Sequence, residues 1–213
     1  MSSTVTDRRP NRREVAAAAT RAEVLAAARR LFTAQGFTGT SITQIAAEAG
    51  VAVQTVYDSV GSKGTLVLAL NDLIDIEAGV PELAAAAATE TEPTGMLAAA
   101  VHLTRVLNER CGDLLGVLLS AQASEPDVAA AVADGMARHR AGMIGLCQEL
   151  AASGALGAGL TADRAATMLA TMTSPATWRQ LTDESGWTFD EAETWLVESL
   201  VTLLLDDRSG RRS

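Results

Sequence analysis

The segment SITQIAAEAGVAVQTVYDSV, residues 41–60, decides the fold of the amino-terminal part of the chain. Ser41 and Gln44 have the S-x-x-Q spacing of a capping box, in which two side chains satisfy free backbone N–H groups at a helix start. Apolar residues at helical spacing follow, so we predict a short helix over 42–49. Gly50 ends it, because glycine readily adopts the positive φ values of a helix-ending turn.

On either side of this turn, the pattern predicts further helices. A second short helix is expected over 53–60, and a longer one runs from its cap Ser62 to about residue 79. Upstream, apolar residues spaced along one helical face predict a helix from residue 13 to Gln35. Two short helices joined by a glycine turn and flanked by longer ones form a helix-turn-helix, which places one helix in the major groove of DNA.

Charge divides the chain in the same way. Residues 1–70 contain eight Lys and Arg against five Asp and Glu, a formal charge of +3, whereas the remainder carries −12. Only the amino-terminal unit is therefore electrostatically suited to DNA. Residues 1–12 predict a disordered basic arm. The arginines of this arm and of the residue after it are Arg8, Arg9, Arg12 and Arg13. They either enter a minor groove of DNA or belong to a solvated tail.

The remainder of the chain is also predicted to be helical. Aliphatic residues dominate and aromatic residues are only 3% of the chain, which favours packed helices over a β fold. We expect a loop or frayed helix end at 81–94, then helices at about 95–110, 113–123, 125–153, 161–182 and 188–206, with N-caps Asp113, Ser124, Thr161 and Thr188. Pro175 is expected to kink its helix. The predicted fold is all-α with about nine helices: a helix-turn-helix domain at 13–70 and a larger helical domain at 71–213.

The exposed face of the second short helix is suited to DNA. Gln54 can reach base edges, and Thr55 can contact a thymine methyl group or a phosphate. The hydroxyl of Tyr57 can reach the DNA backbone. The alternative is that Gln54 and Tyr57 are ordinary surface residues, since helix-glycine-helix patterns are common.

Two helix starts are suited to phosphate. Thr40 and Ser41 lie at the amino end of the helix at 42–49, where free N–H groups and the helix dipole favour an anion. Lys63 has the same position on the following long helix. The predicted DNA-binding residues are Thr40, Ser41, Val53, Gln54, Thr55, Tyr57 and Lys63.

Residues 24–70, VLAAARRLFTAQGFTGTSITQIAAEAGVAVQTVYDSVGSKGTLVLAL, resemble the amino-terminal domain of the TetR family of regulators. The matching features are an LF pair before a G-F turn, T-S-x-x-x-I-A, A-G-V, T-V-Y, and S-K with a following leucine. The resemblance implies a homodimer on an approximately palindromic operator, with contacts from Thr40, Gln54, Thr55, Tyr57 and Lys63. The chain departs from the family at Ala52, where a serine N-cap is usual, and at 58–60, where aromatic residues are common.

The last two predicted helices carry apolar stripes, which serve either a subunit core or a dimer interface. By resemblance they pair with their symmetry mates, which implies an interface at Met168, Met172, Trp195, Leu196, Leu200, Leu203 and Leu204. The resemblance also implies an effector cavity between the middle helices. For this cavity we predict His102, Arg105, Met143 and Trp178, with a solvated face or core filling as the alternatives.

Other classes of protein receive little support from the sequence. His102 and His139 have no recognisable nucleophile, carboxylate pair or metal-ligand partner, so we expect no enzyme, metal site or other cofactor. Cys111 and Cys147 are interpreted as buried residues in a reducing compartment, with a disulfide as the alternative. No apolar run reaches the length of a membrane span and no signal peptide is recognisable, so we expect a cytoplasmic protein without membrane association.

The predicted function is sequence-specific binding to double-stranded operator DNA by a repressor, which a small-molecule effector releases. The effector is expected to shift the long helix after the helix-turn-helix. This shift changes the separation of the two recognition helices, which must be about 34–36 Å on DNA. The alternative is a helical ligand carrier or interaction module without DNA binding, against which the charge division argues.

Overall fold

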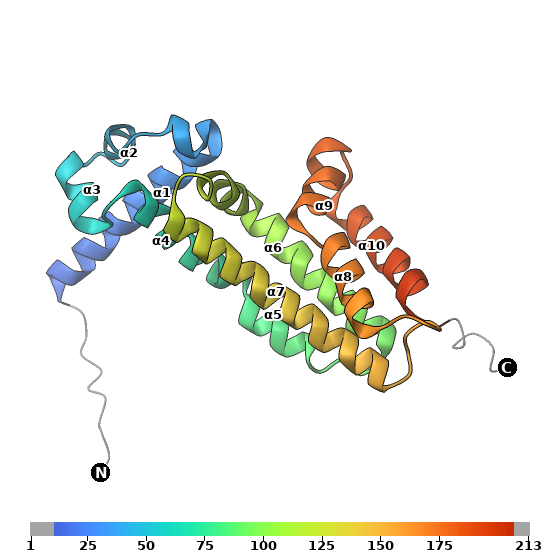
Figure 1. Cartoon of the computed structure of the whole chain (residues 1–213). Helices are drawn as coiled ribbons and strands as arrows, with labels where there is room; N and C mark the ends of the chain where they lie inside the picture. Colours follow the sequence, from blue (N-terminus) through green and yellow to red (C-terminus); the bar gives the residue numbers. More distant parts are fainter. Residues whose placement is uncertain (1–10, 207–213) are drawn as a thin grey trace, which may run out of the picture.

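The structure, a computed structural model, describes residues 11–206 and forms ten α-helices and one π-helical turn over that range (Figure 1). The all-α prediction is confirmed. Most of the predicted basic arm, including Arg8 and Arg9, lies outside the described residues, whereas Arg12 is the first residue of a helix. None of the described helices is long and apolar enough to cross a membrane.

The first four helices form the predicted helix-turn-helix unit. They are α1 (Arg12–Gly39), α2 (Ile42–Glu48), α3 (Val53–Ser59) and α4 (Lys63–Ala78). The capping box at the start of α2 is present, with the Ser41 hydroxyl accepting a hydrogen bond from the Gln44 N–H at 3.2 Å. Gly50, at φ 68°, turns the chain between α2 and α3, as predicted. Ala52 precedes α3 without a side-chain cap bond, so this helix start lacks the usual support.

Of the next three helices, the third agrees with the prediction at 125–153 apart from its N-cap, and the first two differ from the predicted pattern. They are α5 (Val80–Ala87), α6 (Pro93–Ala121) and α7 (Pro126–Ala152). A loop or frayed helix end was expected at 81–94, but residues 81–87 belong to helix α5, because its alanines favour helix once Gly79 has turned the chain. The N-cap of α7 is Glu125, whereas Ser124 donates its hydroxyl to the carbonyl of Ala121 at 3.3 Å.

Helix α6 continues through the break that the sequence predicted after residue 110. Asp113 therefore lies inside a helix and is no N-cap, contrary to the prediction. Cys111 and Leu114, on either side of this turn, are almost completely buried. Their burial outweighs the cost of Gly112 in a helix interior, which is about 1 kcal/mol relative to alanine.

The carboxy-terminal part consists of α8 (Ala162–Met172), α9 (Pro175–Arg179), the π-helical turn η1 (Gln180–Glu184) and α10 (Phe189–Leu204). Thr161 and Thr188 are N-caps, as predicted. Pro175 does not kink one long helix but occupies the start of a separate helix, where its missing N–H needs no partner. Ser174 caps this helix by accepting from the N–H of Thr177 at 3.2 Å.

Two hydrophobic cores share helix α6. The first joins α1–α4 to the carboxy-terminal half of α6, and its large buried residues include Phe32, Ile45, Leu66, Leu70 and Leu114. The second joins the amino-terminal half of α6 to α7–α10, and includes Leu150, Leu169, Trp178, Leu196 and Leu200. The free thiols Cys111 and Cys147 lie one in each core. Because the first core extends beyond residue 70, the helix-turn-helix is packed directly onto the larger domain.

Replacing Thr188 by alanine removes the capping box of α10. Thr188 accepts from the N–H of Glu191 at 3.2 Å, and the Glu191 carboxylate accepts from the N–H of Thr188 at 2.8 Å. We expect Thr188→Ala to lower the free energy of unfolding by about 1 kcal/mol, measured by urea denaturation. Thr202→Ala is the control, because the Thr202 hydroxyl only bonds the carbonyl of Glu198 within the same helix. Equal losses in both variants would contradict the capping role.

His139 makes stability depend on pH. Its Nε2 atom is buried without a hydrogen-bond partner, and burial, with a smaller effect of Arg140, lowers its pKa. The unfolded chain therefore takes up this proton at a higher pH than the folded chain, so the associated stability is lost as pH falls below about 6.5. We expect the free energy of unfolding to fall between about pH 7 and pH 5.

The variant His139→Leu tests this assignment, because leucine cannot take up a proton. Denaturation curves over the same pH range should fall less steeply for His139→Leu than for the wild type. Thr202→Ala should keep the wild-type slope. An unchanged slope in His139→Leu would assign the pH dependence to other groups.

Candidate nucleic-acid interface and ligand cavity

Helix α3 presents most of the predicted recognition residues on its outer face. Val56 is completely buried and fixes the inner face, whereas Val53 and Tyr57 are 38% and 49% exposed. Gln54 is exposed and donates its amide to the Asp58 carboxylate at 2.8 Å. Asp58 thus orders the side chain of Gln54, while the amide oxygen of Gln54 stays an available acceptor. Thr55 lies at the edge of this face and is half-buried.

Thr40 and Lys63 are placed differently from what the sequence suggested. The Thr40 hydroxyl is buried and donates to the carbonyl groups of Gly36 and Leu31, at 2.9 Å and 3.2 Å. The Lys63 ammonium group donates to the carbonyl groups of Phe37 and Thr40, at 2.7 Å and 3.0 Å, and lies 4.0 Å from the centre of the Phe37 ring. Lys63 therefore fastens the α1–α2 turn to α4, whereas the Thr40 side chain holds this turn against α1. Their predicted phosphate contacts would require these bonds to be exchanged.

Two further ion or hydrogen-bond contacts fix the helix-turn-helix. Arg21 on α1 donates to the carbonyl of Ser59 at the end of α3, at 2.7 Å. Arg30 on α1 pairs with Glu48 at the end of α2, at 2.9 Å. Ser41 is exposed at the start of α2, with its hydroxyl engaged in the capping box. These contacts hold the helix-turn-helix rigid, and none of them involves a side chain on the outer face of α3.

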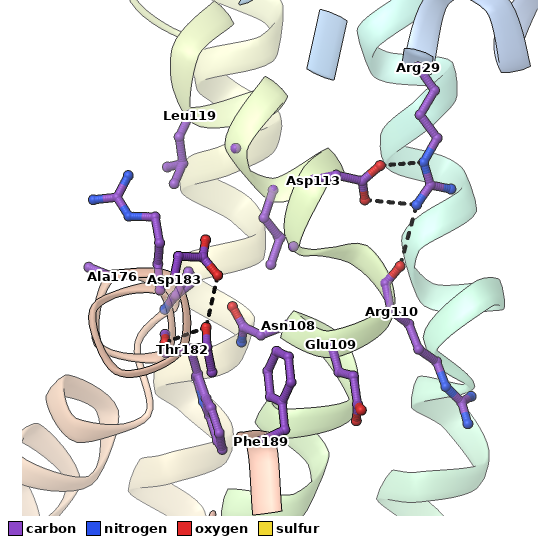
Figure 2. Close-up of a pocket in the computed structure, with 16 residues that line it drawn as sticks. Arg29, Asn108, Glu109, Arg110, Asp113, Leu119, Ala176, Thr182, Asp183 and Phe189 are labelled. Carbon is purple, nitrogen blue, oxygen red and sulfur yellow. Dashed lines mark hydrogen bonds and ion pairs between the residues drawn. The ribbon is translucent and has the colours of Figure 1, made fainter. Parts of the chain in front are cut away.

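A cavity of about 510 Å³ lies along the carboxy-terminal half of α6, next to α9, η1 and the start of α10 (Figure 2). Its apolar wall consists of Leu115, Leu119, Pro175, Ala176, Trp178 and Phe189, together with Gly112 and Gly116. Its polar wall includes Asn108, Asp113, Thr182 and Asp183. Arg29 of α1 also lines it, so the cavity reaches the helix-turn-helix. An apolar surface with a few polar groups is typical of small-molecule sites.

Of the predicted ligand residues, Trp178 lines this cavity. Its side chain is 1% exposed, donates from Nε1 to the Thr104 hydroxyl at 3.2 Å, and stacks on Phe189 with ring centres 5.8 Å apart. Met143 instead fills the second core. The sequence therefore identified one wall residue, and it missed the polar wall because Arg29, Asn108 and Asp113 come together only through packing.

His102 and Arg105 do not line the cavity but form an ion-pair cluster between α6 and α10. His102 Nδ1 lies 2.8 Å from the Glu193 carboxylate, and Arg105 pairs with Asp190 at 2.6 Å and with Glu193. These carboxylates raise the pKa of Arg105, so it stays charged. The two residues predicted as polar contacts for a ligand therefore connect two helices of the subunit.

The apolar stripe of α10 has two faces. Leu196, Leu200 and Leu204 are completely buried within the subunit, so they have no surface left for a partner, contrary to the prediction. Trp195 and Leu203 are 42% and 52% exposed. Trp187 adds to this exposed face by packing edge-on against Trp195, with ring centres 5.7 Å apart. On α8, Met168 and Met172 are half-buried.

The amino-terminal domain matches a family model. Residues 24–70 match the model described as "Bacterial regulatory proteins, tetR family". This segment contains α2, α3 and parts of α1 and α4, the helices of the candidate DNA interface. A comparison with curated proteins gave no match.

Solved structures with the same fold cover nearly the whole chain. A TetR transcriptional regulator from Chloroflexus aurantiacus is 23% identical with a TM-score of 0.65, and the match covers 90% of this chain and 98% of that one. NalD from Pseudomonas aeruginosa, the secondary repressor of the MexAB-OprM multidrug efflux pump, is 21% identical with a TM-score of 0.69, covering 91% and 99%. FadR from Bacillus subtilis, solved with stearoyl-CoA, is 16% identical with a TM-score of 0.67, covering 85% and 97%.

The sequence match and the fold thus agree over the same helices. The helix-turn-helix at α1–α4 carries the family signature, and the larger helical domain follows in the arrangement that regulators of this kind have. The chain has the fold of solved TetR regulators, and its residues 24–70 match the model of the TetR family of bacterial regulatory proteins.

Proposed function

We propose that this protein is a dimeric repressor that binds operator DNA through α3 and leaves it when a small molecule occupies the cavity beside α6. The observation that carries the proposal is the outer face of α3, where Gln54 and Tyr57 are exposed on a helix-turn-helix of family type. A glutamine amide can bond adenine in the major groove, and a tyrosine hydroxyl can bond a phosphate. The formal charge of +3 on residues 1–70 also supports binding of this part of the chain to DNA.

A homodimer is supported by the exposed apolar face of α10. Trp195 and Leu203 lie on this face with Trp187, and large exposed aromatic residues are typical of interfaces. Two copies joined here would present two copies of α3, and such a dimer reads two half-sites one helical turn apart. The proposed interface therefore comprises Trp195, Leu203 and the partly exposed Met168 and Met172.

The proposed effector is an amphipathic small molecule. The cavity volume of about 510 Å³ lies within the usual range for such ligands, and its wall combines Trp178 and Phe189 with the polar side chain of Asn108. NalD is a repressor, and FadR was solved with a ligand, stearoyl-CoA. A ligand carrier without DNA binding is the second candidate, favoured by the acidic charge of −12 on the larger domain.

Binding of DNA is tested with the full-length protein and the DNA upstream of its own coding region. We expect a gel shift that weakens steeply with salt, because phosphate binding releases counterions. Tyr57→Phe removes one hydroxyl from the surface of α3 and should weaken binding about two- to tenfold, the value of one hydrogen bond. Thr202→Ala on α10 should bind as the wild type does. A wild-type protein that binds neither this DNA nor a random DNA pool would favour the ligand carrier.

The dimer is tested by placing a charge on the exposed face of α10. Trp195→Glu should convert the protein to a monomer in sedimentation velocity, because an unpaired carboxylate in an interface must be desolvated. Met136→Glu is the matched control, since Met136 is an exposed apolar residue of α7, 48% accessible and outside the proposed interface. A wild-type monomer, or dissociation by both variants alike, would contradict this interface.

A further inference from the structure

Arg29 connects three helices through its guanidinium group. It donates to the Asp113 carboxylate on α6 from Nε at 2.6 Å and from Nη2 at 2.8 Å. It donates from Nη1 to the Glu77 carboxylate on α4 at 2.7 Å. A longer bond reaches the carbonyl of Arg110 at 3.3 Å. The two parallel bonds to Asp113 form the bidentate geometry that fixes both distance and orientation between arginine and carboxylate.

This contact joins the helix-turn-helix to the ligand cavity. Arg29 belongs to α1, and both Arg29 and Asp113 line the cavity beside α6. Figure 2 shows the Asp113 carboxylate turned toward Arg29, on the opposite side of α6 from Thr182 and Asp183. Burial alone would raise the pKa of Asp113, but the hydrogen bond and charge of Arg29, together with backbone hydrogen bonds from Leu114 and from Asp113 itself, lower it overall, so the pair is ionic at neutral pH.

Empty space lies directly beside this pair. Gly112 and Gly116 are one helical turn apart on α6, and both line the cavity. A Cβ atom built on either glycine would have no neighbouring heavy atom within 4 Å. Each glycine costs a helix about 0.5–1 kcal/mol relative to alanine, so a pair of them without a packing need points to another use of the space.

The opposite wall of the cavity has an unusual backbone. Thr182 and Asp183 belong to the π-helical turn Gln180–Glu184. Such turns are rare and are often found at functional sites. The Thr182 hydroxyl is held by the carbonyl of Trp178 and the Asp183 carboxylate, both at 3.0 Å, so this wall is well ordered. A molecule between the two walls would be pressed against the turn of α6 that contains Gly112 and Asp113.

We propose that the Arg29–Asp113 pair couples the cavity to the DNA-binding domain: an occupant lying over Gly112 and Gly116 separates Asp113 from Arg29 and releases α1 from α6. This coupling rests on the proposed function, and it specifies the route by which the cavity acts. After the separation, Arg29 keeps its bond to Glu77 on α4, so its charge stays paired. The Asp113 carboxylate loses its arginine, but its side chain is 30% exposed and can be hydrated. A ligand drives the change if it binds the separated state more tightly than the paired one.

A side chain in place of Gly116 can imitate the occupant. Helical side chains lean toward the amino terminus, so a leucine at 116 would lie over Gly112 and Asp113. We expect Gly116→Leu to weaken binding to the DNA selected by the wild type about five- to fiftyfold, within the usual range of allosteric coupling. Gly116→Ala adds only a methyl group and should stay within twofold of the wild type. Gly112→Met places the same bulk one turn away and serves if Gly116→Leu does not fold.

The double variant separates coupling from simple stabilisation. Asp113→Asn removes the ionic bond and should weaken DNA binding to a similar extent as Gly116→Leu. If the pair is the route, Gly116→Leu should cause no further loss in the Asp113→Asn background, within twofold. Arg179→Ala is the control, because Arg179 lines the cavity without a described bond to α1. Losses that multiply in the double variant, or none from Gly116→Leu, would overturn the proposal.

Hydrogen exchange provides a readout that does not depend on DNA. In both Gly116→Leu and Asp113→Asn, backbone amides of α1 around Arg29 should exchange several-fold faster, whereas those of α8 should not change. If the wild type binds no DNA, the proposed function fails, while this exchange result still decides the coupling. Unchanged exchange in α1 in both variants would overturn the coupling even in a protein that binds DNA.

Discussion

Burial of the long helix α6 is the constraint on which the rest of the structure depends. Its carboxy-terminal half completes the core of the helix-turn-helix, and its amino-terminal half completes the core of the larger domain. Because this single helix of 29 residues takes part in both cores, a displacement of one of its ends moves the other end as well. The helix-turn-helix and the larger domain are therefore mechanically one body, even though their formal charges are opposite.

The boundary between the two cores is where polar groups and empty space occur. Thr104, which is almost completely buried, bonds Trp178 at this level, and the cavity lies directly beside it. Side chains here are held by directed hydrogen bonds and ion pairs in place of close apolar packing. Such bonds have discrete partners and can be exchanged, whereas a packed core resists deformation. The position of the cavity is thus a consequence of how the two cores meet.

Local features of the fold could be predicted from the sequence, because they are encoded within a few residues. The caps at Ser41, Thr161 and Thr188 and the turn at Gly50 were all predicted correctly. Continuation of α6 through Gly112 could not be predicted in this way, since tertiary burial overrides a local helix-breaking signal. Contacts between residues far apart in the sequence could not be predicted either.

The candidate sites follow the same division. The exposed face of α3 follows from helical periodicity, so Gln54 and Tyr57 were identified from the sequence. Lys63 was expected to contact a phosphate, but in the structure its ammonium group bonds the carbonyl groups of Phe37 and Thr40. Arg105 was expected in a cavity, but carboxylates of α10 neutralise it. A signal for the actual cavity existed in the spacing of Gly112 and Gly116, which leaves one helical face without side chains.

Helix α10 encodes two different properties in adjacent residues. Leu196 and Leu204 are buried in the subunit, whereas their sequence neighbours Trp195 and Leu203 face outward. A substitution on the inner face of α10 affects the stability of the subunit, whereas one on the outer face affects only contacts with other molecules. In the proposed dimer, a few outward substitutions would therefore change which subunit pairs with this one while the fold is preserved.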